Sequence, residues 1–365
     1  MFETIVQWVF GLIGGAMVAG SLLCLSKHPH WFVRGWEFPR IQIAVIVAVC
    51  GVIYAAVNSE WGWFDAALLA AFGLCVLWQL AVVSRYTPLW PKSLLDATDR
   101  REGRSFRMVV SNVLMQNDEL EKWKRTVLAE DPDVILAVET DEKWCGVLRS
   151  LEDRYPHAVY RPQDNMYGMA LVSRLPLIDP EVKFIVDEEY PSIHTRVRLP
   201  CGETFLLIGA HPPPPEPIRD KDSKERDAEL VILGRDHIDG RPAVIAGDLN
   251  DVAWSHSSRL FKRLSRMLDL RIGRGLFNTW DANSWWQRAP LDHVYQTDHF
   301  RLIEFRLLGH VGSDHFPMVV ELSYEPQNAD EQEPPAEQNG DQEEATEKIQ
   351  LQAEDGGVES MENPA

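Results

Sequence analysis

The chain has 365 residues, of which 36 are Lys or Arg and 55 are Asp or Glu, so its formal charge at pH 7 is −19. Such a length accommodates one large domain or two ordinary ones. The sequence contains no long basic run, which argues against a protein that binds nucleic acid through its own positive charge. An enzyme that binds phosphate through a metal ion is not excluded. The five cysteines show no CxxC or Cys/His spacing, so neither a disulfide framework nor a zinc site is predicted.

Three uncharged apolar stretches dominate the first 85 residues. Each has about 20 residues, the length that a helix needs to cross a bilayer. Glycines such as Gly14 and Gly20 suit close helix contacts in lipid, and no basic segment precedes the first stretch as it would in a signal peptide. We therefore predict a transmembrane region over residues 1–85, with a buried helical domain as the alternative. Its helices are expected at about residues 4–26, 41–59 and 66–84.

The basic residues around these stretches predict an orientation. The first connection carries Lys27, Arg34 and Arg40, and more basic residues follow the third stretch, whereas the second connection carries only Glu60. Loops rich in Lys and Arg stay preferentially in the cytoplasm. We therefore expect the C-terminal domain to be cytoplasmic, with the opposite topology as the alternative.

From residue 105 onward, short apolar segments alternate with amphipathic ones. Residues 86–104 contain Pro88, Pro91 and Gly103 and are expected to form a linker. Strands are expected at 106–113, 134–138, 168–173, 195–199, 205–210, 243–246, 293–295, 302–307 and 318–322, and helices around 120–128, 222–233 and 260–268. This order over residues 105–324 predicts an α/β (α+β) fold, a four-layer sandwich of two packed β-sheets flanked by helices.

The last segment, residues 325–365, has a different composition. It contains thirteen acidic residues, one lysine and no aromatic residue, and therefore carries twelve of the nineteen net negative charges. A segment of this kind buries too little apolar surface to offset its ordering entropy. The sequence predicts an acidic disordered tail.

Polar residues stand at the ends of the predicted strands. Gly247-Asp248-Leu249-Asn250 is the most informative group, because a carboxylate and an amide follow a buried strand and a glycine allows close approach. The same context holds Asn112, Glu139 and His211 after strands, and Asp292 and Ser313-Asp314-His315 before strands. Oxygen ligands in this position suit Mg²⁺, and histidines beside carboxylates supply proton relay and positive charge for hydrolysis.

At this point the chain resembles the endonuclease/exonuclease/phosphatase superfamily, which includes DNase I-like nucleases, inositol polyphosphate 5-phosphatases and neutral sphingomyelinases. The resemblance extends roughly from Phe106 to Tyr324 and follows the family's order. Together with the three apolar stretches, it indicates the membrane-anchored bacterial branch of the superfamily, and hence a multi-pass protein of the bacterial inner membrane. The matching motifs are Ser111-Asn112-Val113, Val138-Glu139, Gly168 to Arg174, Ala210-His211-Pro212, Gly247 to Asn250, Leu291-Asp292-His293 and Ser313-Asp314-His315.

The resemblance implies a role for each residue. The implied metal is Mg²⁺, with Mn²⁺ as an alternative, and in-line attack of water on phosphorus is the implied reaction. The implied metal ligands are Glu139, Asn112 and Asp314, with Asp314 binding a second metal or tuning His315. The implied catalytic residues are Asp248 for the attacking water, His315 for the charge on phosphorus, Asp292 to orient His315, and His211 near the leaving oxygen. Asn250, Asn112 and His211 are the implied substrate-binding residues.

Several of these residues have a structural alternative. Asp248 and Asn250 suit an Asx turn, and Asp292 suits a turn before a strand. His211 precedes four prolines, which could be only a stiff loop. The sequence does not decide whether four aromatic residues line the site or have only a structural role, namely Tyr167, Trp280, Trp285 and Trp286. Three other histidines are expected to be surface or core residues, namely His157, His194 and His256.

The leading hypothesis is a membrane-anchored phosphoesterase that hydrolyses a phosphate ester or pyrophosphate, with a lipid-linked substrate. A membrane-tethered endo- or exonuclease is the alternative, and a non-catalytic scaffold that recruits partners through its acidic tail is a third. The expected partners are the lipid bilayer and a phosphorylated substrate, lipid-linked or nucleic acid. The sequence indicates no obligate protein partner.

Overall fold

The computed structural model describes residues 2–98, 102–215, 221–238 and 240–356. The chain divides into two compact units. The first comprises the residues up to Trp90 together with Pro215 and residues 221–223, and the second comprises the other described residues. Parts of the predicted linker (99–101) and of the predicted tail (357–365) lie outside the described residues.

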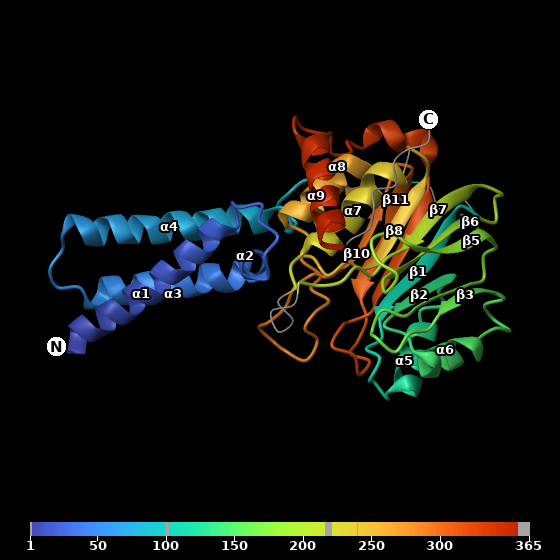
Figure 1. Ribbon diagram of the computed structural model, residues 1–365, viewed down its shortest axis with the longest axis horizontal. Helices are drawn as coiled ribbons and strands as arrows, with labels where there is room; N and C mark the ends of the chain where they lie inside the picture. Colours follow the sequence, from blue (N-terminus) through green and yellow to red (C-terminus); the bar gives the residue numbers. More distant parts are fainter. Residues whose placement is uncertain (1, 99–101, 216–220, 239, 357–365) are drawn as a thin grey trace. The chain divides into compact units, whose positions relative to one another are not determined.

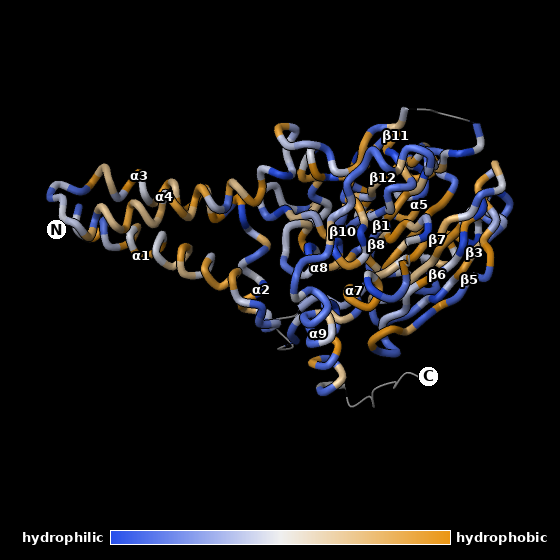
Figure 2. The backbone as a smooth tube through the Cα atoms, turned by 90° about the horizontal axis from the view of Figure 1, so that it is seen from above, coloured by the Kyte–Doolittle hydropathy of each residue, from blue (hydrophilic) through white to orange (hydrophobic). Residues whose placement is uncertain are grey.

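The first unit consists of three long helices with a short helical connection. The long helices are α1 (Phe2–Leu23), α3 (Arg40–Val57) and α4 (Trp63–Ser84), and the connection holds α2 (Trp31–Arg34) and η1 (Gly35–Glu37). All three long helices are long and apolar enough to cross a membrane, and Figure 2 shows them hydrophobic along most of their length. Gly14 and Gly20 allow close packing, because a Cβ would lie 2.3 Å from Phe72 at the first and 2.4 Å from Trp36 at the second.

A buried polar chain links these three helices. The guanidinium of Arg40 donates to the side-chain oxygen of Gln79 (2.9 Å), and the amide of Gln79 donates to the hydroxyl of Ser21 (2.8 Å). These three residues are at most 3% exposed and lie on α3, α4 and α1 respectively. Such bonds between apolar helices are directional, and therefore they specify how the helices are rotated and staggered.

The second unit contains two six-stranded mixed sheets. The first has the order β11-β12-β1-β2-β4-β3, and the second has the order β5-β6-β7-β8-β10-β9. The strands of the first are β1 (Ser105–Asn112), β2 (Val134–Val138), β3 (His157–Arg161), β4 (Met169–Ser173), β11 (Phe300–Leu307) and β12 (Met318–Tyr324). Those of the second are β5 (Leu177–Phe184), β6 (Pro191–Arg198), β7 (Thr204–Gly209), β8 (Ala243–Asp248), β9 (Leu268–Asp269) and β10 (Asp292–Gln296).

The strands at whose ends the predicted site residues stand lie in the middle of each sheet. β1 pairs in parallel with β2, and β7 pairs in parallel with β8, so the carboxyl ends of each pair lie at one edge. β12 runs antiparallel to β1, and β10 runs antiparallel to β8. The residues that begin β12 and β10 therefore reach the same edges where β1 and β8 end.

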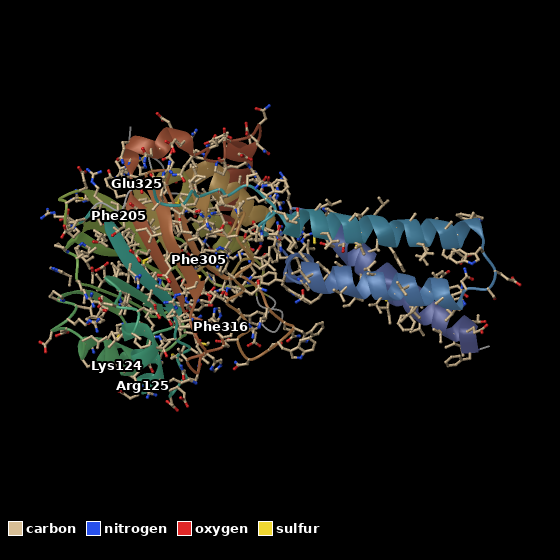
Figure 3. All side chains as sticks on the ribbon, turned by 180° about the vertical axis from the view of Figure 1, so that it is seen from behind. Lys124, Arg125, Phe205, Phe305, Phe316 and Glu325 are labelled. Carbon is tan, nitrogen blue, oxygen red and sulfur yellow. The ribbon has the colours of Figure 1, made fainter. Side chains whose placement is uncertain are left out.

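Three apolar clusters produce the predicted four layers. The largest lies between the sheets and includes Val110, Leu136, Phe205 and Val244, and Figure 3 places Phe205 among the strands. On the outer face of the first sheet pack α5 (Leu120–Leu128) and α6 (Glu142–Arg149), and on that of the second pack α7 (Lys224–Asp236) and α8 (His256–Ser265). Figure 1 shows these helix pairs on opposite sides of the sheets, which confirms the sandwich.

Two segments differ from the sequence-based expectation. In the predicted linker, Leu94 is fully buried in the core between the sheets, and the backbone amide of Ala97 donates to Leu302 (2.8 Å). In the predicted disordered tail, residues 341–356 form the helix α9 (Asp341–Gly356), which packs on α7 and α8. The tail prediction failed because composition averages over a segment, whereas Ala345 and Ile349 lie on one helical face and pack into an apolar cluster.

Candidate active site

Six buried polar side chains meet at one edge of the sandwich, three from each sheet. Asn112 ends β1, Glu139 follows β2, and His315 precedes β12 in the first sheet. In the second sheet, His211 follows β7, Asp248 ends β8 and Asp292 begins β10. All six are at most 8% exposed.

The backbone at this edge adopts conformations that restrict the sequence. Gly247 has φ of +143°, and a Cβ there would lie 2.0 Å from the carbonyl oxygen of Ala210. Glu139 and Asn250 have φ of +62° and +51°, in the left-handed region that non-glycine residues seldom occupy. Because such backbone strain gathers at functional sites, these turns support a functional edge.

Asn112 joins the two sheets. Its amide Nδ2 donates to Oε1 of Glu139 at 2.7 Å and to Oδ2 of Asp248 at 3.0 Å, and its Oδ1 accepts from the amide of Leu114 at 3.0 Å. The hydroxyl of Ser313 donates to the carbonyl of Asn112 at 2.8 Å and so ties the segment before β12 to the end of β1. One asparagine thus holds two carboxylates from different sheets in place.

His315 lies between two carboxylates. Its Nδ1 donates to Oδ2 of Asp292 at 2.6 Å, and its Nε2 lies 3.5 Å from Oδ2 of Asp248. Burial alone would lower the pKa of His315, but the charges of Asp292 and Asp248 outweigh it and raise that pKa to about 10. The site therefore contains a buried imidazolium at neutral pH.

Asp248 and His211 have the opposite protonation tendencies. Burial works to raise the pKa of Asp248, but His315, His211 and the Asn112 amide hold it below its usual value, so the carboxylate is ionised. Burial lowers the pKa of His211, against the attraction of Asp248 at 3.9 Å, so this imidazole is neutral. Its ring centroid lies 5.3 Å from that of Tyr167, which places Tyr167 beside the site.

Asn250 and Asp314, the other two predicted residues, lie at the margin. The amide of Asn250 donates to the carbonyl of Pro212 at 2.9 Å, and its backbone N–H donates to Oδ1 of Asp248 at 3.0 Å. Asp314 is half-buried, and its Oδ2 accepts from the indole of Trp280 at 3.3 Å. The structure thus brings six of the eight predicted residues together, with Asn250 and Asp314 beside them.

A comparison with protein-family models shows the family of this chain. Residues 109–315 match the model of the Endonuclease/Exonuclease/phosphatase family. The chain belongs to this family. Its members are metal-dependent phosphoester hydrolases, so the prediction of a phosphoester-hydrolysing enzyme is confirmed at the level of the family.

Three similar solved structures have TM-scores near 0.5, and one of them exceeds it. The D. rerio TDP2 structure complexed with single strand DNA product has a TM-score of 0.51 and 15% identity, and the match covers 60% of this chain and 99% of that chain. An endonuclease/exonuclease/phosphatase from Beutenbergia cavernae DSM 12333 gives 0.49 and 18%, covering 61% and 72%. The human Nocturnin catalytic domain with bound sulfate anion gives 0.48 and 16%, covering 60% and 95%. A comparison with curated proteins yields no match.

Glu139 fits the divalent cation that the family requires. Its Oε2 is buried and has no hydrogen-bond partner, and burial raises the pKa of its carboxyl to about 7. A cation would compensate this orphaned oxygen. Asp248, Asp292 and His315 also offer ligand atoms within 4.8 Å of one another, but an imidazolium has no lone pair to donate. The carboxylate of Glu139 is therefore the better ligand.

Three residues without a role in the sequence analysis support this edge. The hydroxyl of Thr279 accepts from the backbone amides of Leu291 (3.2 Å) and Asp292 (3.1 Å). Burial lowers the pKa of His293 to about 3, so the ring is neutral, and its Nε2 donates to the carbonyl of Asp251 at 2.8 Å. The guanidinium of Arg271, fully buried, donates to the carbonyl of Asp292. Only His293 had a signal in the sequence, its place in a matching motif.

Proposed function

We propose that the protein is a membrane-anchored phosphoesterase that hydrolyses a phosphate ester or pyrophosphate by in-line attack of water, on a lipid-linked substrate near the bilayer. The observation that carries this proposal is the position of the buried His315 between two carboxylates: its Nδ1 lies 2.6 Å from Oδ2 of Asp292, and its Nε2 lies 3.5 Å from Oδ2 of Asp248. A site of this kind presents a fixed positive charge beside a base. Both are needed when charge develops on a phosphoryl group.

Each side chain then has a task that its environment supports. Asp248, whose pKa is held low, orients the attacking water and accepts its proton. The imidazolium of His315, oriented by Asp292, stabilises negative charge on the phosphoryl oxygens. Neutral His211, buried 3.9 Å from Asp248, donates an N–H to the leaving oxygen. Asn250 gives one amide N–H to Pro212, and its second N–H is assigned to a non-bridging oxygen.

Glu139 and Asn112 would hold the divalent cation, Mg²⁺ or Mn²⁺. Bound there, the cation supplies positive charge that neutralises phosphate oxygens. Because Nδ2 of Asn112 donates to Glu139 and Asp248, only its Oδ1, which also accepts from the amide of Leu114, has lone pairs that could bind a cation. Asp314 is proposed to tune His315, since it lies next to His315 in the chain and adds to the charges that raise the pKa of His315.

Two features support a substrate at a bilayer. The three helices α1, α3 and α4 present large apolar side chains outward, as in Val52 (70% exposed) and Leu74 (68%), which a membrane would cover. In the second unit, Trp285 is 89% exposed on the loop that begins at Trp280, and the indole of Trp280 bonds Asp314 next to His315. Exposed tryptophan suits the interfacial region of a membrane.

The proposed location is the bacterial inner membrane, with the catalytic unit on the cytoplasmic side. The basic residues of the first connection and those after α4 support this orientation. Reporter fusions after Arg104 and after Ser59 test it. Cytoplasmic-type activity at Arg104 and periplasmic-type activity at Ser59 are expected, and the reverse pattern would require a periplasmic substrate.

Hydrolysis by the purified full chain in detergent tests the proposed activity. With Mg²⁺ present, phospholipids and lipid pyrophosphates are expected to be hydrolysed faster than soluble inositol phosphates or plasmid DNA. Glu139→Ala and His315→Ala should abolish hydrolysis. Equal activity in these variants would refute the assigned site. Cleavage of DNA alone, lost in Asp248→Asn, would show a nuclease instead.

A further inference from the structure

The C-terminal helix α9 lies outside the residues that match the family, yet it reaches the catalytic edge through a buried chain of contacts. Its inward face repeats at helical spacing, with Asp341, Ala345, Lys348 and Gln352 in successive turns. Figure 1 shows α9 beside α7 and α8, and its contacts fall into two groups.

The first group attaches the helix to the domain. Asp341 accepts two bonds from the guanidinium of Arg263, at 2.7 and 2.8 Å. Ala345 is fully buried in an apolar cluster with residues of α7 and α8. The amide of Gln352 donates to the carbonyl of Val186 at 3.0 Å. These contacts dock α9 without any contribution from its single basic residue, Lys348.

The second group leads to the active site. The ammonium of Lys348 donates to Oδ2 of Asp227 at 2.8 Å, and Oδ1 of Asp227 accepts from the guanidinium of Arg226 at 2.9 Å. Arg226 then donates to the carbonyl of Asn250 at 2.8 Å and lies 3.5 Å from the carboxylate of Asp251. Lys348 is 7% exposed, and Asp227 and Arg226 are each 1% exposed.

The end of this chain of contacts is the turn that contains the base. Asn250 has φ of +51°, and its backbone amide donates to the carboxylate of Asp248. A residue in this conformation needs its surroundings to hold it. With both oxygens of Asp227 bonded, the carboxylate has a fixed orientation, and Arg226 in turn is directed at the Asn250 carbonyl.

We propose that α9 is a positioning element of the active site and that Lys348 acts through Asp227 and Arg226 to hold the turn from Gly247 to Asn250. The inference rests on the proposed function, because it takes Asp248 in this turn as the base of a phosphoester hydrolase. Lys348 is a positioning residue, since four hydrogen bonds in series connect it to Asp248. A helix that merely caps α7 and α8 would require only the first group of contacts.

The test uses the full chain in detergent with Mg²⁺ and bis(p-nitrophenyl) phosphate as the probe. Lys348→Met is expected to lower kcat roughly tenfold with KM changed less than about twofold, because substrate contacts remain while the base loses its orientation. Lys348→Arg should restore most of the rate, since it keeps the charge and a donor. Glu347→Gln, the exposed neighbour on α9, serves as the control and should leave kcat unchanged.

Hydrogen exchange of the backbone amides is measured on the same variants. In Lys348→Met, the amides of Leu249 and Asn250 should exchange faster, while those of α9 keep their wild-type rates. Unchanged kcat together with unchanged exchange at Leu249 and Asn250 would overturn the proposal. If Lys348→Met does not fold, Asp227→Asn weakens the same link and is measured in its place.

The exchange measurement also separates the two proposals. If the wild-type chain does not hydrolyse the probe or the lipid panel, the proposed function fails. The link from α9 to the turn is then judged by exchange alone, with the same expected and contrary results. If the wild-type chain is active and Lys348→Met behaves as wild type in both measurements, only the positioning proposal fails.

Discussion

Replacing Glu139 with glutamine is expected to stabilise the metal-free protein while it abolishes the response to metal. Burial raises the pKa of Glu139 to about 7, from an ordinary value of 4.5, so the folded protein binds this proton more tightly than the unfolded chain does. The ionised carboxylate therefore costs stability in full above about pH 7; this cost shrinks as the pH falls from about 7 to 4.5 and is absent below 4.5. The difference corresponds to roughly 3 kcal/mol of unfolding free energy at pH 8.

Glutamine removes the charge and keeps an acceptor for the Asn112 amide, which lies 2.7 Å from Oε1. Its new N–H groups take the place of Oε2, an atom with no hydrogen-bond partner, and this costs about 1 kcal/mol. The net gain at pH 8 is then about 2 kcal/mol. For a unit of this size, that gain raises Tm by roughly 4–8 °C.

The assay is thermal unfolding of the full chain in detergent, at pH 8 and pH 5, with EDTA or with Mg²⁺. In EDTA the variant should unfold at a higher temperature at pH 8, and most of the difference should vanish at pH 5. Mg²⁺ should raise the Tm of the wild type only. The exposed Glu152→Gln is the matched control and should show none of these effects. A lower Tm for Glu139→Gln in EDTA at pH 8, or an equal gain from Mg²⁺, would refute the reasoning.

Three further outcomes are expected. Asp292→Asn should reduce kcat by about 10²- to 10⁴-fold, because His315 loses the charged partner 2.6 Å from its Nδ1. The control is Asp153→Asn, an exposed position, which should leave kcat unchanged. Equal kcat values for Asp292→Asn and the wild type would exclude the orienting role. Gly247→Ala should lower the unfolding free energy by more than about 2 kcal/mol, because its Cβ would overlap the Ala210 carbonyl. In Gly146→Ala, inside α6, the new Cβ meets open space, and the unfolding free energy should rise by up to about 1 kcal/mol. Denaturant titration measures both variants. Trp285→Ser should slow hydrolysis of a vesicle-embedded substrate severalfold and leave a soluble chromogenic ester unaffected; a loss on both would place Trp285 inside the site instead.

The strands and their polar ends were accessible from the sequence, because burial on both faces leaves a continuous apolar run. Val134–Val138 was predicted with its observed bounds, and Glu139 follows it directly. β5 was missed because it is half exposed, contains Pro180 and has an irregular register against β6, so its sequence shows no regular alternation. α6 was missed because only eight residues form it, too few for a clear period.

For the candidate site too, one part could be predicted from the sequence and another could not. Which residues stand at the edge could be predicted from strand ends, but their protonation could not, because it depends on distances between residues far apart in the chain. His211 and His315 occupy similar places after or before strands, and yet one is neutral and the other charged. The difference arises because Asp292 bonds only His315.

The pairing of β1 with β12 has a consequence for the order of events during synthesis. Ser105 pairs with Ser323, and β12 is the last strand of the first sheet in the chain. A ribosome must therefore release nearly the whole domain before the segment that carries His315 can join Asn112 and Glu139. The three apolar helices α1, α3 and α4 emerge long before that, so they are complete before these residues can come together. The candidate site is therefore completed only after the last strand of the first sheet has been synthesised.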